Sequence, residues 1–234
     1  MHRFIQILFF LLLFVSLPVQ SQKREKRSVV RLETNMGNIR IALSDQTPKH
    51  RDNFLKLVGR GFYDGMIFHR VIENFMIQAG DPLVRKNAIC DTFDVNYTIP
   101  AEIVFPDLYH SRGSVAAARE PDDVNPDYES SASQFYIVWG EKMTPGKMKR
   151  SVSYLKGRGI ELDRFMIDEY QVCGGSPHLD GAYTVFGEVI EGLAIVGEIQ
   201  ALPTDSKDRP LDDILIIRAV VEQLSENVSS LENK

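Results

Sequence analysis

The chain reads FHRVIENFMIQAGD from Phe68 to Asp81, a mostly apolar stretch that holds one arginine and one glutamine. Its first five residues alternate as a β-strand does, which predicts two faces: Phe68, Arg70 and Ile72 on one, His69 and Val71 on the other. Arg70 is thus expected beside apolar side chains, where a cation is costly unless something pairs with it or uses it. Taken alone, the stretch favours a plainer alternative, an arginine at a strand edge that pairs with a carboxylate or extends its head into water.

Composition indicates a single globular domain with an appendage. The 234 residues are 44% hydrophobic and 25% charged, which is ordinary for a soluble chain. The formal net charge of −5 argues against nucleic acid as a partner, because nucleic acid favours a basic face. The sequence has neither a glycine-rich phosphate loop nor the Cys and His spacing of a zinc site, so we expect no metal and no cofactor.

The N-terminus has the pattern of a secretory signal peptide. A short positive start precedes an almost purely apolar run from Ile7 to Leu17, and the pattern predicts cleavage near Ser21 or Gln22. The alternative is a membrane anchor, but the run is well short of the roughly 20 residues that a span needs. We therefore expect four segments: a signal peptide over residues 1–21, a charged linker over 22–28, one domain over 29–223 and a polar tail over 224–234.

Strand and helix patterns flank the stretch on both sides. Val29–Glu33 and Asn38–Leu43 alternate around a hairpin turn. Thr47-Pro48 predicts the start of a helix, with Thr47 as its cap, and this helix should close one end of a barrel. Further elements are predicted downstream: strands over Ile99–Ile103, Gly113–Ala118, Gln134–Val138, Tyr183–Val189 and Leu211–Val221, and a short helix over Gly192–Ala201.

Residues 142–175 interrupt this β pattern. Thr144-Pro145 repeats the helix-start signal, and two runs of helical spacing lie on either side of Gly157-Arg158-Gly159. Gly174-Gly175 ends the second run. We predict a separately folding helical hairpin, inserted between two strands, whose charged side chains face each other or water. A role in binding a partner is the alternative for this insert.

The stretch from Phe68 to Asp81 resembles the FHRV-x-x-x-FM-x-Q-x-GD signature of the cyclophilins, the peptidyl-prolyl cis-trans isomerases. Five more segments are similar to the same family in the same order: Val30–Ile41, Thr47–Gly65, Tyr97–Glu102, Ser133–Ile137 and Leu179–Gly192. This resemblance implies a mainly β fold. We expect a closed antiparallel eight-stranded β-barrel capped by two helices, with the helical hairpin as an insert beside the active face.

The resemblance also implies the residues of a site. The catalytic set is Arg70, Gln78 and Gln134, of which the two glutamines hold the substrate backbone. The substrate-binding set is Phe75, Met76, Ala118, Arg119, Tyr136, His178, Leu179 and Tyr183. The chain departs from the family at four of these positions. The family usually has phenylalanine at Tyr136, and many members have asparagine at Arg119 and histidine at Tyr183. Many also have, at His178, the tryptophan that contacts cyclosporin. His69, next to the arginine, is expected to be a hydrogen-bonded structural histidine.

An arginine suits prolyl isomerisation for a physical reason. The uncatalysed reaction takes tens to hundreds of seconds, because amide resonance sets a barrier of about 18–20 kcal/mol. The transition state is a twisted amide whose lone pair is localised on the proline nitrogen. A donor aimed at that lone pair stabilises the twisted amide more than the planar one, and a guanidinium offers fixed donors and a permanent charge.

We expect a peptidyl-prolyl cis-trans isomerase that acts on X–Pro bonds in exported, unfolded or extended polypeptides and assists their folding. We expect proline-containing polypeptides, and not nucleic acid, as its partners. We also expect a monomer without a stable membrane anchor. The alternative from another class is a proline-peptide-binding chaperone module with little turnover. The sequence of residues 178–183 resembles that of bacterial members of the family. We therefore expect the protein in the periplasm, with secretion or a secretory-pathway lumen as the alternative. Such compartments permit a disulfide between Cys90 and Cys173, but the spacing does not demand one.

Overall fold

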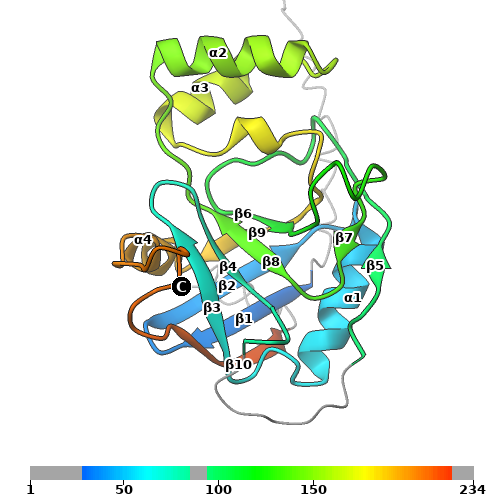
Figure 1. The fold of residues 1–234 in the computed structure, drawn as a ribbon, viewed down its shortest axis with the longest axis vertical. Coiled ribbons are helices and arrows are strands. Elements are labelled where there is room, and N and C mark those ends of the chain that lie inside the picture. Colours follow the sequence, from blue (N-terminus) through cyan, green and yellow to red (C-terminus); the bar gives the residue numbers. More distant parts are fainter. Residues whose placement is uncertain (1–27, 85–93, 223–234) are drawn as a thin grey trace, which may run out of the picture.

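The structure, a computed structural model, describes residues 28–84 and 94–222. Within this part of the chain, eight strands close an antiparallel barrel in the order β1-β10-β3-β4-β8-β6-β9-β2 (Figure 1). Their bounds are Val29–Thr34 (β1), Gly37–Leu43 (β2), Met66–Ile72 (β3), Met76–Ala79 (β4), Ser114–Ala117 (β6), Phe135–Val138 (β8), Val185–Glu191 (β9) and Leu215–Glu222 (β10). A separate small sheet pairs β5 (Thr98–Ile99) with β7 (Ser130–Ser131). The predicted eight-stranded barrel is confirmed.

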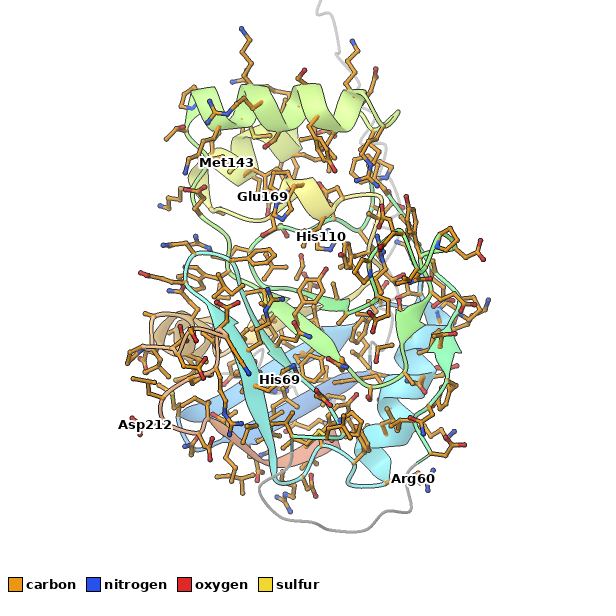
Figure 2. The ribbon with its side chains drawn as sticks, in the orientation of Figure 1. Arg60, His69, His110, Met143, Glu169 and Asp212 are labelled. Carbon is orange, nitrogen blue, oxygen red and sulfur yellow. The ribbon has the colours of Figure 1, made fainter. Side chains whose placement is uncertain are left out.

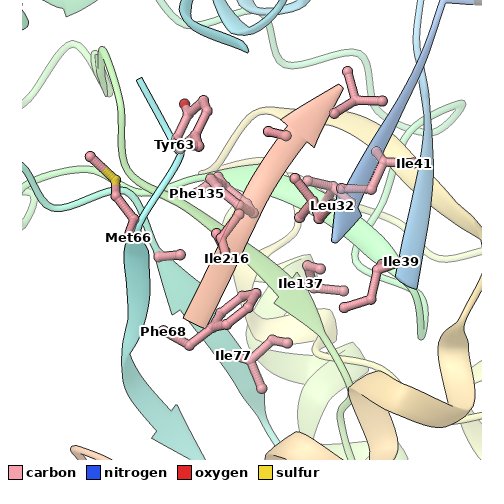
Figure 3. Packing of buried hydrophobic residues seen from close by; sticks show 14 of the residues in the cluster. Leu32, Ile39, Ile41, Tyr63, Met66, Phe68, Ile77, Phe135, Ile137 and Ile216 are labelled. Atoms are coloured by element: carbon pink, nitrogen blue, oxygen red, sulfur yellow. The ribbon is translucent and has the colours of Figure 1, made fainter. Parts of the chain in front are cut away.

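Apolar side chains fill the barrel, and two helices close its ends. Side chains such as Leu32, Phe68 and Ile137 have at most 1% of their surface exposed and meet inside the barrel (Figure 3). Helix α1 (Pro48–Gly59) and helix α4 (Leu193–Gln200) each bury apolar residues in the same core, and they lie at opposite ends of the barrel (Figure 1). The two predicted capping helices are therefore confirmed.

The start of α1 is capped by a residue far away in the sequence. Thr47 occupies the expected position, but its side chain makes no capping bond and its hydroxyl is buried without a partner in the described residues. Glu102 takes the role instead: its carboxylate accepts the backbone N–H groups of Lys49 at 3.1 Å and His50 at 3.0 Å. A carboxylate also suits the positive end of the helix dipole. The predicted helix start and the N-cap position of Thr47 are right, but the capping hydrogen bonds come from Glu102 and not from the Thr47 side chain.

Strand β3 contains a bulge that reverses part of the predicted face pattern. Phe68 pairs with Ala79 and Arg70 with Gln78, so one extra residue, His69, lies between two consecutive partners on β4. A bulge of this kind shifts the alternation by one position. Phe68 and Val71 therefore both point into the barrel core, and Arg70 lies on the outer face instead of beside Phe68. The prediction that Phe68 and Arg70 share a face is wrong.

His69 also differs from its predicted role. Its Nδ1 atom is buried and makes no hydrogen bond within the described residues, so the predicted hydrogen-bonded histidine is not found at this nitrogen. Burial lowers the pKa of His69, because the charged imidazolium is disfavoured away from water.

The predicted insert is a pair of helices between β8 and β9. Helix α2 (Pro145–Lys156) begins at Thr144, whose side chain accepts the backbone N–H of Lys147, and α3 (Arg164–Val172) follows after the glycine break. The hairpin is confirmed, but it is not a separate unit. Its buried residues share one apolar cluster with the loop that precedes β6: Met148, Met166 and Tyr170 from the helices, Phe105 and Tyr109 from the loop.

Gly175 joins the root of the insert to the barrel. It forms isolated β-bridges with Ser111 and Glu141, and its φ of +145° is one that side chains disfavour. A Cβ atom at this position would lie 2.5 Å from the His110 carbonyl oxygen and 2.6 Å from the Tyr170 ring. Glycine is therefore needed here for the close approach of two backbones, whereas α3 already ends at Val172.

Several predictions fall outside the described residues. These are the signal peptide, all of the charged linker but Ser28, the polar tail and Cys90. Cys173, which directly follows α3, is exposed, and the structure does not test the permitted disulfide because Cys90 lies outside the described residues. None of the helices in residues 28–84 and 94–222 has the length and apolar character that crossing a membrane requires.

Candidate active site

A cavity of about 220 Å³ lies on the outer face of the barrel, over β3, β4, β8 and β6. Its walls contain nine of the predicted site residues: Arg70, Phe75, Met76, Gln78, Ala118, Arg119, Tyr136, Leu179 and Tyr183. The remaining two, Gln134 and His178, lie at its border, since each contacts a residue of the wall. The structure thus brings together residues that are spread over more than a hundred positions of the sequence.

Strand register explains why the polar and aromatic groups meet. Arg70 on β3 pairs with Gln78 on β4, Gln78 pairs with Tyr136 on β8, and Tyr136 pairs with Ala116 on β6. Directly paired residues of neighbouring strands point to the same side of a sheet. The β3 bulge is essential to this row, because it turns Arg70 outward while Phe68 and Val71 remain in the core.

Arg70 is oriented by a carboxylate from the loop before β10. Its Nε atom donates to Asp208 Oδ2 at 3.3 Å, and the backbone N–H of Val71 donates to the Asp208 carbonyl at 2.7 Å. Both charged side chains are nearly half exposed, at 44% for Arg70 and 43% for Asp208. Within the described residues, the two Nη groups of Arg70 make no hydrogen bond. The guanidinium is therefore held at one edge and has donors left for a ligand.

The two glutamines connect this cavity to a second, more polar one. Gln78 Nε2 donates to Gln134 Oε1 at 3.1 Å. The second cavity, of about 640 Å³, shares Gln78, Ala118 and Arg119 with the first and extends to Tyr97 and Glu129. Because they share these residues, the two cavities adjoin and form one groove, and Arg70 lines its smaller part.

The side chain of Arg119 is engaged with its own surroundings. Its Nε donates to the Ala182 carbonyl at 2.8 Å and an Nη group donates to Asp122 at 2.6 Å, while the guanidinium lies between the rings of Tyr128 and Tyr183. Only 2% of this side chain is exposed. Arg119 therefore builds the wall between the cavities and has little capacity to bind a substrate through its charge.

The short 3₁₀ helix η1 (Pro177–Leu179) supplies the wall opposite β4. Leu179 lines the cavity, and the exposed His178 ring lies 5.4 Å from the ring of Phe75. η1 directly follows the insert and packs against α2. The position of His178 next to the cavity agrees with the placement that the sequence resemblance implies.

Sequence reasoning missed three residues that support the site. Asp208 orients Arg70, and His110 and Asp180 are buried residues that form a hydrogen-bonded group with Tyr136. None of them belongs to a local pattern, and Asp208 lies 138 positions from Arg70. Burial raises the pKa of Tyr136 well above that of a free phenol, so its hydroxyl remains a hydrogen-bond donor at neutral pH.

Comparisons with known proteins agree with this geometry. The family model described as "Cyclophilin type peptidyl-prolyl cis-trans isomerase/CLD" matches residues 29–221. The chain is 32% identical over 216 residues to "Peptidyl-prolyl cis-trans isomerase-like 2" of Rhizopus delemar, which covers 91% of this chain but only 33% of that longer protein. It is 30% identical over 192 residues to "Peptidyl-prolyl cis-trans isomerase ppi1" of Schizosaccharomyces pombe, covering 82% of this chain and 97% of that protein.

A bacterial relative and a solved structure extend the comparison. A "Putative peptidyl-prolyl cis-trans isomerase" of Staphylococcus aureus is 31% identical over 201 residues, covering 82% of this chain and 90% of that protein. A crystal structure of a Cryptosporidium parvum cyclophilin type peptidyl-prolyl cis-trans isomerase matches with a TM-score of 0.60 at 26% identity, covering 84% of this chain and 98% of that one. The relatives are eukaryotic and bacterial alike, so they do not single out the exported bacterial members that the sequence favoured.

Proposed function

Because this chain belongs to the cyclophilin-type peptidyl-prolyl cis-trans isomerases, we propose that it isomerises X–Pro bonds in exported polypeptides and so assists their folding. The observation that carries the proposal is the position of Arg70. It is nearly half exposed and lines a cavity that also has apolar walls, its Nε is held by Asp208, and its Nη donors are unused by the described residues. No covalent step is required, because the reaction breaks no bond and transfers no proton to water.

Each part of the cavity has a task in this reaction. The apolar walls formed by Phe75, Met76 and Leu179 hold the proline ring, and the polar amides of Gln78 and Gln134 hold the neighbouring backbone. As the amide twists, it loses resonance and its nitrogen becomes a better acceptor. The Nη donors of Arg70 stabilise this twisted form more than the planar one, which lowers the barrier. Each 1.4 kcal/mol removed from the barrier gives about a tenfold faster reaction.

The substrate class follows from the shape of the groove. An extended segment with proline in the 220 Å³ cavity would place the residues before the proline beside the Gln78–Gln134 pair, toward the larger cavity. A second solved structure of the Cryptosporidium parvum enzyme, with a TM-score of 0.58, was determined in the presence of the dipeptide Ala-Pro. That name supports proline peptides as the ligands to test first.

The exported location is part of the same proposal. It is supported by the positive start and the apolar run from Ile7 to Leu17, which have the pattern of a secretory signal peptide. The periplasm is proposed as the compartment because the sequence of residues 178–183 resembles that of bacterial members. The test is to fractionate cells that produce the full chain and to determine the N-terminus and intact mass of the product. A soluble periplasmic product that begins near Gln22 supports export, whereas a full-length product retained in the membrane contradicts it.

The test of the activity must separate turnover from binding. Exchange NMR on an Ala-Pro peptide measures the cis-trans exchange rate directly, and the same spectra give the dissociation constant. The proposed isomerase accelerates exchange at catalytic enzyme concentrations. If the protein binds the peptide but leaves the exchange rate unchanged, the site is a binding module and the proposed activity is wrong.

A further inference from the structure

A line of four buried side chains connects the wall of the proline cavity to the insert. The Tyr136 hydroxyl lies 3.0 Å from His110 Nε2, and His110 Nδ1 lies 3.0 Å from Asp180 Oδ1. The other carboxylate oxygen of Asp180 accepts the Tyr170 hydroxyl at 2.6 Å. All four side chains belong to residues that are at most 5% exposed. Figure 2 shows His110 between the barrel and the insert helices.

The chemistry of these groups fixes one direction for each hydrogen bond. An ionised carboxylate only accepts, so Asp180 requires a proton on His110 Nδ1 and on the Tyr170 hydroxyl. In neutral imidazole the other nitrogen, Nε2, is then an acceptor, and the Tyr136 hydroxyl donates to it. Burial raises the pKa values of both tyrosines, which keeps their hydroxyl groups protonated as this pattern requires. Every polar atom in the line thus has a partner.

The two ends of the line lie in different parts of the molecule. Tyr136 is on β8 and lines the cavity, while Tyr170 is on α3 and is fixed in the core of the insert. Asp180, in the middle, directly follows Leu179 and also accepts the backbone N–H of His110 at 2.8 Å. The carboxylate therefore holds two cavity walls in place, one through the side chain of Tyr136 and the other through the chain that carries Leu179.

We propose that Tyr170, Asp180 and His110 are positioning residues through which the insert sets the shape of the proline cavity. The insert is then a working part of the substrate site, although none of its own side chains lines the 220 Å³ cavity. The proposal builds on the isomerase function proposed above, but it concerns binding of the proline side chain and does not involve Arg70. It accounts for the tight backbone junction at Gly175, which keeps Tyr170 aligned with Asp180.

Removing the Tyr170 hydroxyl should weaken the positioning of the cavity walls. It should not affect the Arg70 guanidinium, the donor that acts on the twisted amide. Asp180 Oδ2 would lose its hydrogen bond in a buried site, so the carboxylate and the two walls it holds would shift. We expect KM and the peptide dissociation constant to rise about threefold to tenfold, the range associated with one buried hydrogen bond. The value of kcat should stay within about twofold, because Arg70 and Asp208 keep their contacts.

The experiment compares Tyr170→Phe with Tyr154→Phe. Tyr154 is an exposed tyrosine on α2 and is not a member of the line, so it controls for the loss of a hydroxyl from the insert. The readouts are kcat and KM, the dissociation constant of an Ala-Pro peptide, and the ¹⁵N chemical shifts of His110, which report its tautomer. The proposal expects weaker binding and altered His110 shifts for Tyr170→Phe alone. It is overturned if both variants bind the peptide as the wild type does and leave His110 unchanged.

A double-mutant cycle distinguishes a connected line from two independent sites. If Tyr136 and Tyr170 act through His110 and Asp180, their effects on peptide binding should not add. The double variant Tyr136→Phe, Tyr170→Phe should then have about the same peptide dissociation constant as the single variant that binds the peptide more weakly. If the fold-change in the dissociation constant of the double variant equals the product of the two single fold-changes, the two tyrosines act independently, and the proposal is overturned. Thermal unfolding confirms that each variant is folded. If Tyr170→Phe does not fold, Asp180→Asn is a second substitution that breaks the hydrogen-bonded line. Peptide binding and the His110 chemical shifts do not depend on turnover. They therefore still test this proposal if the protein proves to have no isomerase activity.

Discussion

Arg70 works as a donor only if its guanidinium has a fixed orientation, and Asp208 provides it. The contact is made at Nε, so both Nη groups of this cavity-lining residue are left as donors. Asp208 has a φ of +63°, a left-handed conformation that aspartate and asparagine tolerate better than most residues. The turn is itself held by Asp205, whose carboxylate accepts the backbone N–H groups of Lys207 and Arg209. One surface turn thus positions the arginine that the proposed mechanism uses.

Asp208→Asn tests this positioning. Asparagine keeps the shape and the left-handed backbone but loses the charge, and an exposed ion pair contributes at most about 1 kcal/mol. We expect kcat/KM to fall about twofold to fivefold, with unchanged thermal stability. Asp212→Asn, an exposed acid in the same loop (Figure 2), is the matched control and should leave kcat/KM unchanged. Equal activity of both variants with the wild type would mean that Asp208 does not orient Arg70.

At this scale, the sequence identified the residues that line the cavity but not those that support them. Arg70, Gln78 and Tyr136 could be placed because they lie in short stretches with a recognisable wording. Asp208, His110 and Asp180 could not, because their partners are distant and no periodic pattern marks them. The unexpected role of Arg119 has a mixed origin, because Asp122 and Tyr128 come from its own loop while Tyr183 is distant in the sequence.

Among the elements, the insert could be predicted from local sequence patterns, whereas the direction of the side chains on β3 could not. Thr144-Pro145 and the central glycines predicted both insert helices, because a cap and a break are local signals. The β3 bulge was not predicted, because the alternation of Phe68 to Ile72 looks the same whether or not an extra residue is accommodated. Only pairing with β4 decides which side chains point inward.

Substituting Gly175 tests the junction of the insert with the barrel. In Gly175→Ala the new methyl group would collide with the His110 carbonyl and the Tyr170 ring, at a φ that alanine disfavours. We expect the free energy of unfolding to fall by at least about 2 kcal/mol. The matched control is Gly146→Ala in α2, where a Cβ atom meets nothing within 4 Å and stability should stay equal or rise by up to about 1 kcal/mol. A Gly175→Ala protein as stable as the wild type would contradict the close contact.

For the whole molecule, buried histidines make stability depend on pH. Burial lowers the pKa of His50, although Glu102 lies 2.7 Å from Nδ1 and favours the charged form. Its Nε2 atom is buried without a partner in the described residues, so a proton there would be unsatisfied. The unfolded chain therefore binds a proton more readily than the folded one, and stability falls as the pH drops below the unfolded pKa of about 6.5.

We expect the free energy of unfolding to decrease between pH 7 and pH 5, with a slope from His50 of at most about 1.4 kcal/mol per pH unit. Urea unfolding at several pH values measures it. His50→Gln should flatten the curve, although the burial of His69, which also lowers its pKa, will leave part of the slope. A wild-type curve that rises toward pH 5, or an unaltered slope in His50→Gln, would contradict this assignment.

The fold as a whole brings together a barrel, a bulge and a distant turn so that one guanidinium lines the cavity beside the apolar walls of Phe75, Met76 and Leu179. The most direct test is the isomerisation rate of Arg70→Ala beside Arg164→Ala, an exposed arginine on α3 whose side chain is 84% accessible. We predict that Arg70→Ala remains folded by thermal unfolding and loses about 10²-fold or more of kcat/KM, as expected for removal of one transition-state donor. Arg164→Ala should match the wild type. Activity of folded Arg70→Ala within about twofold of the wild type would contradict the account.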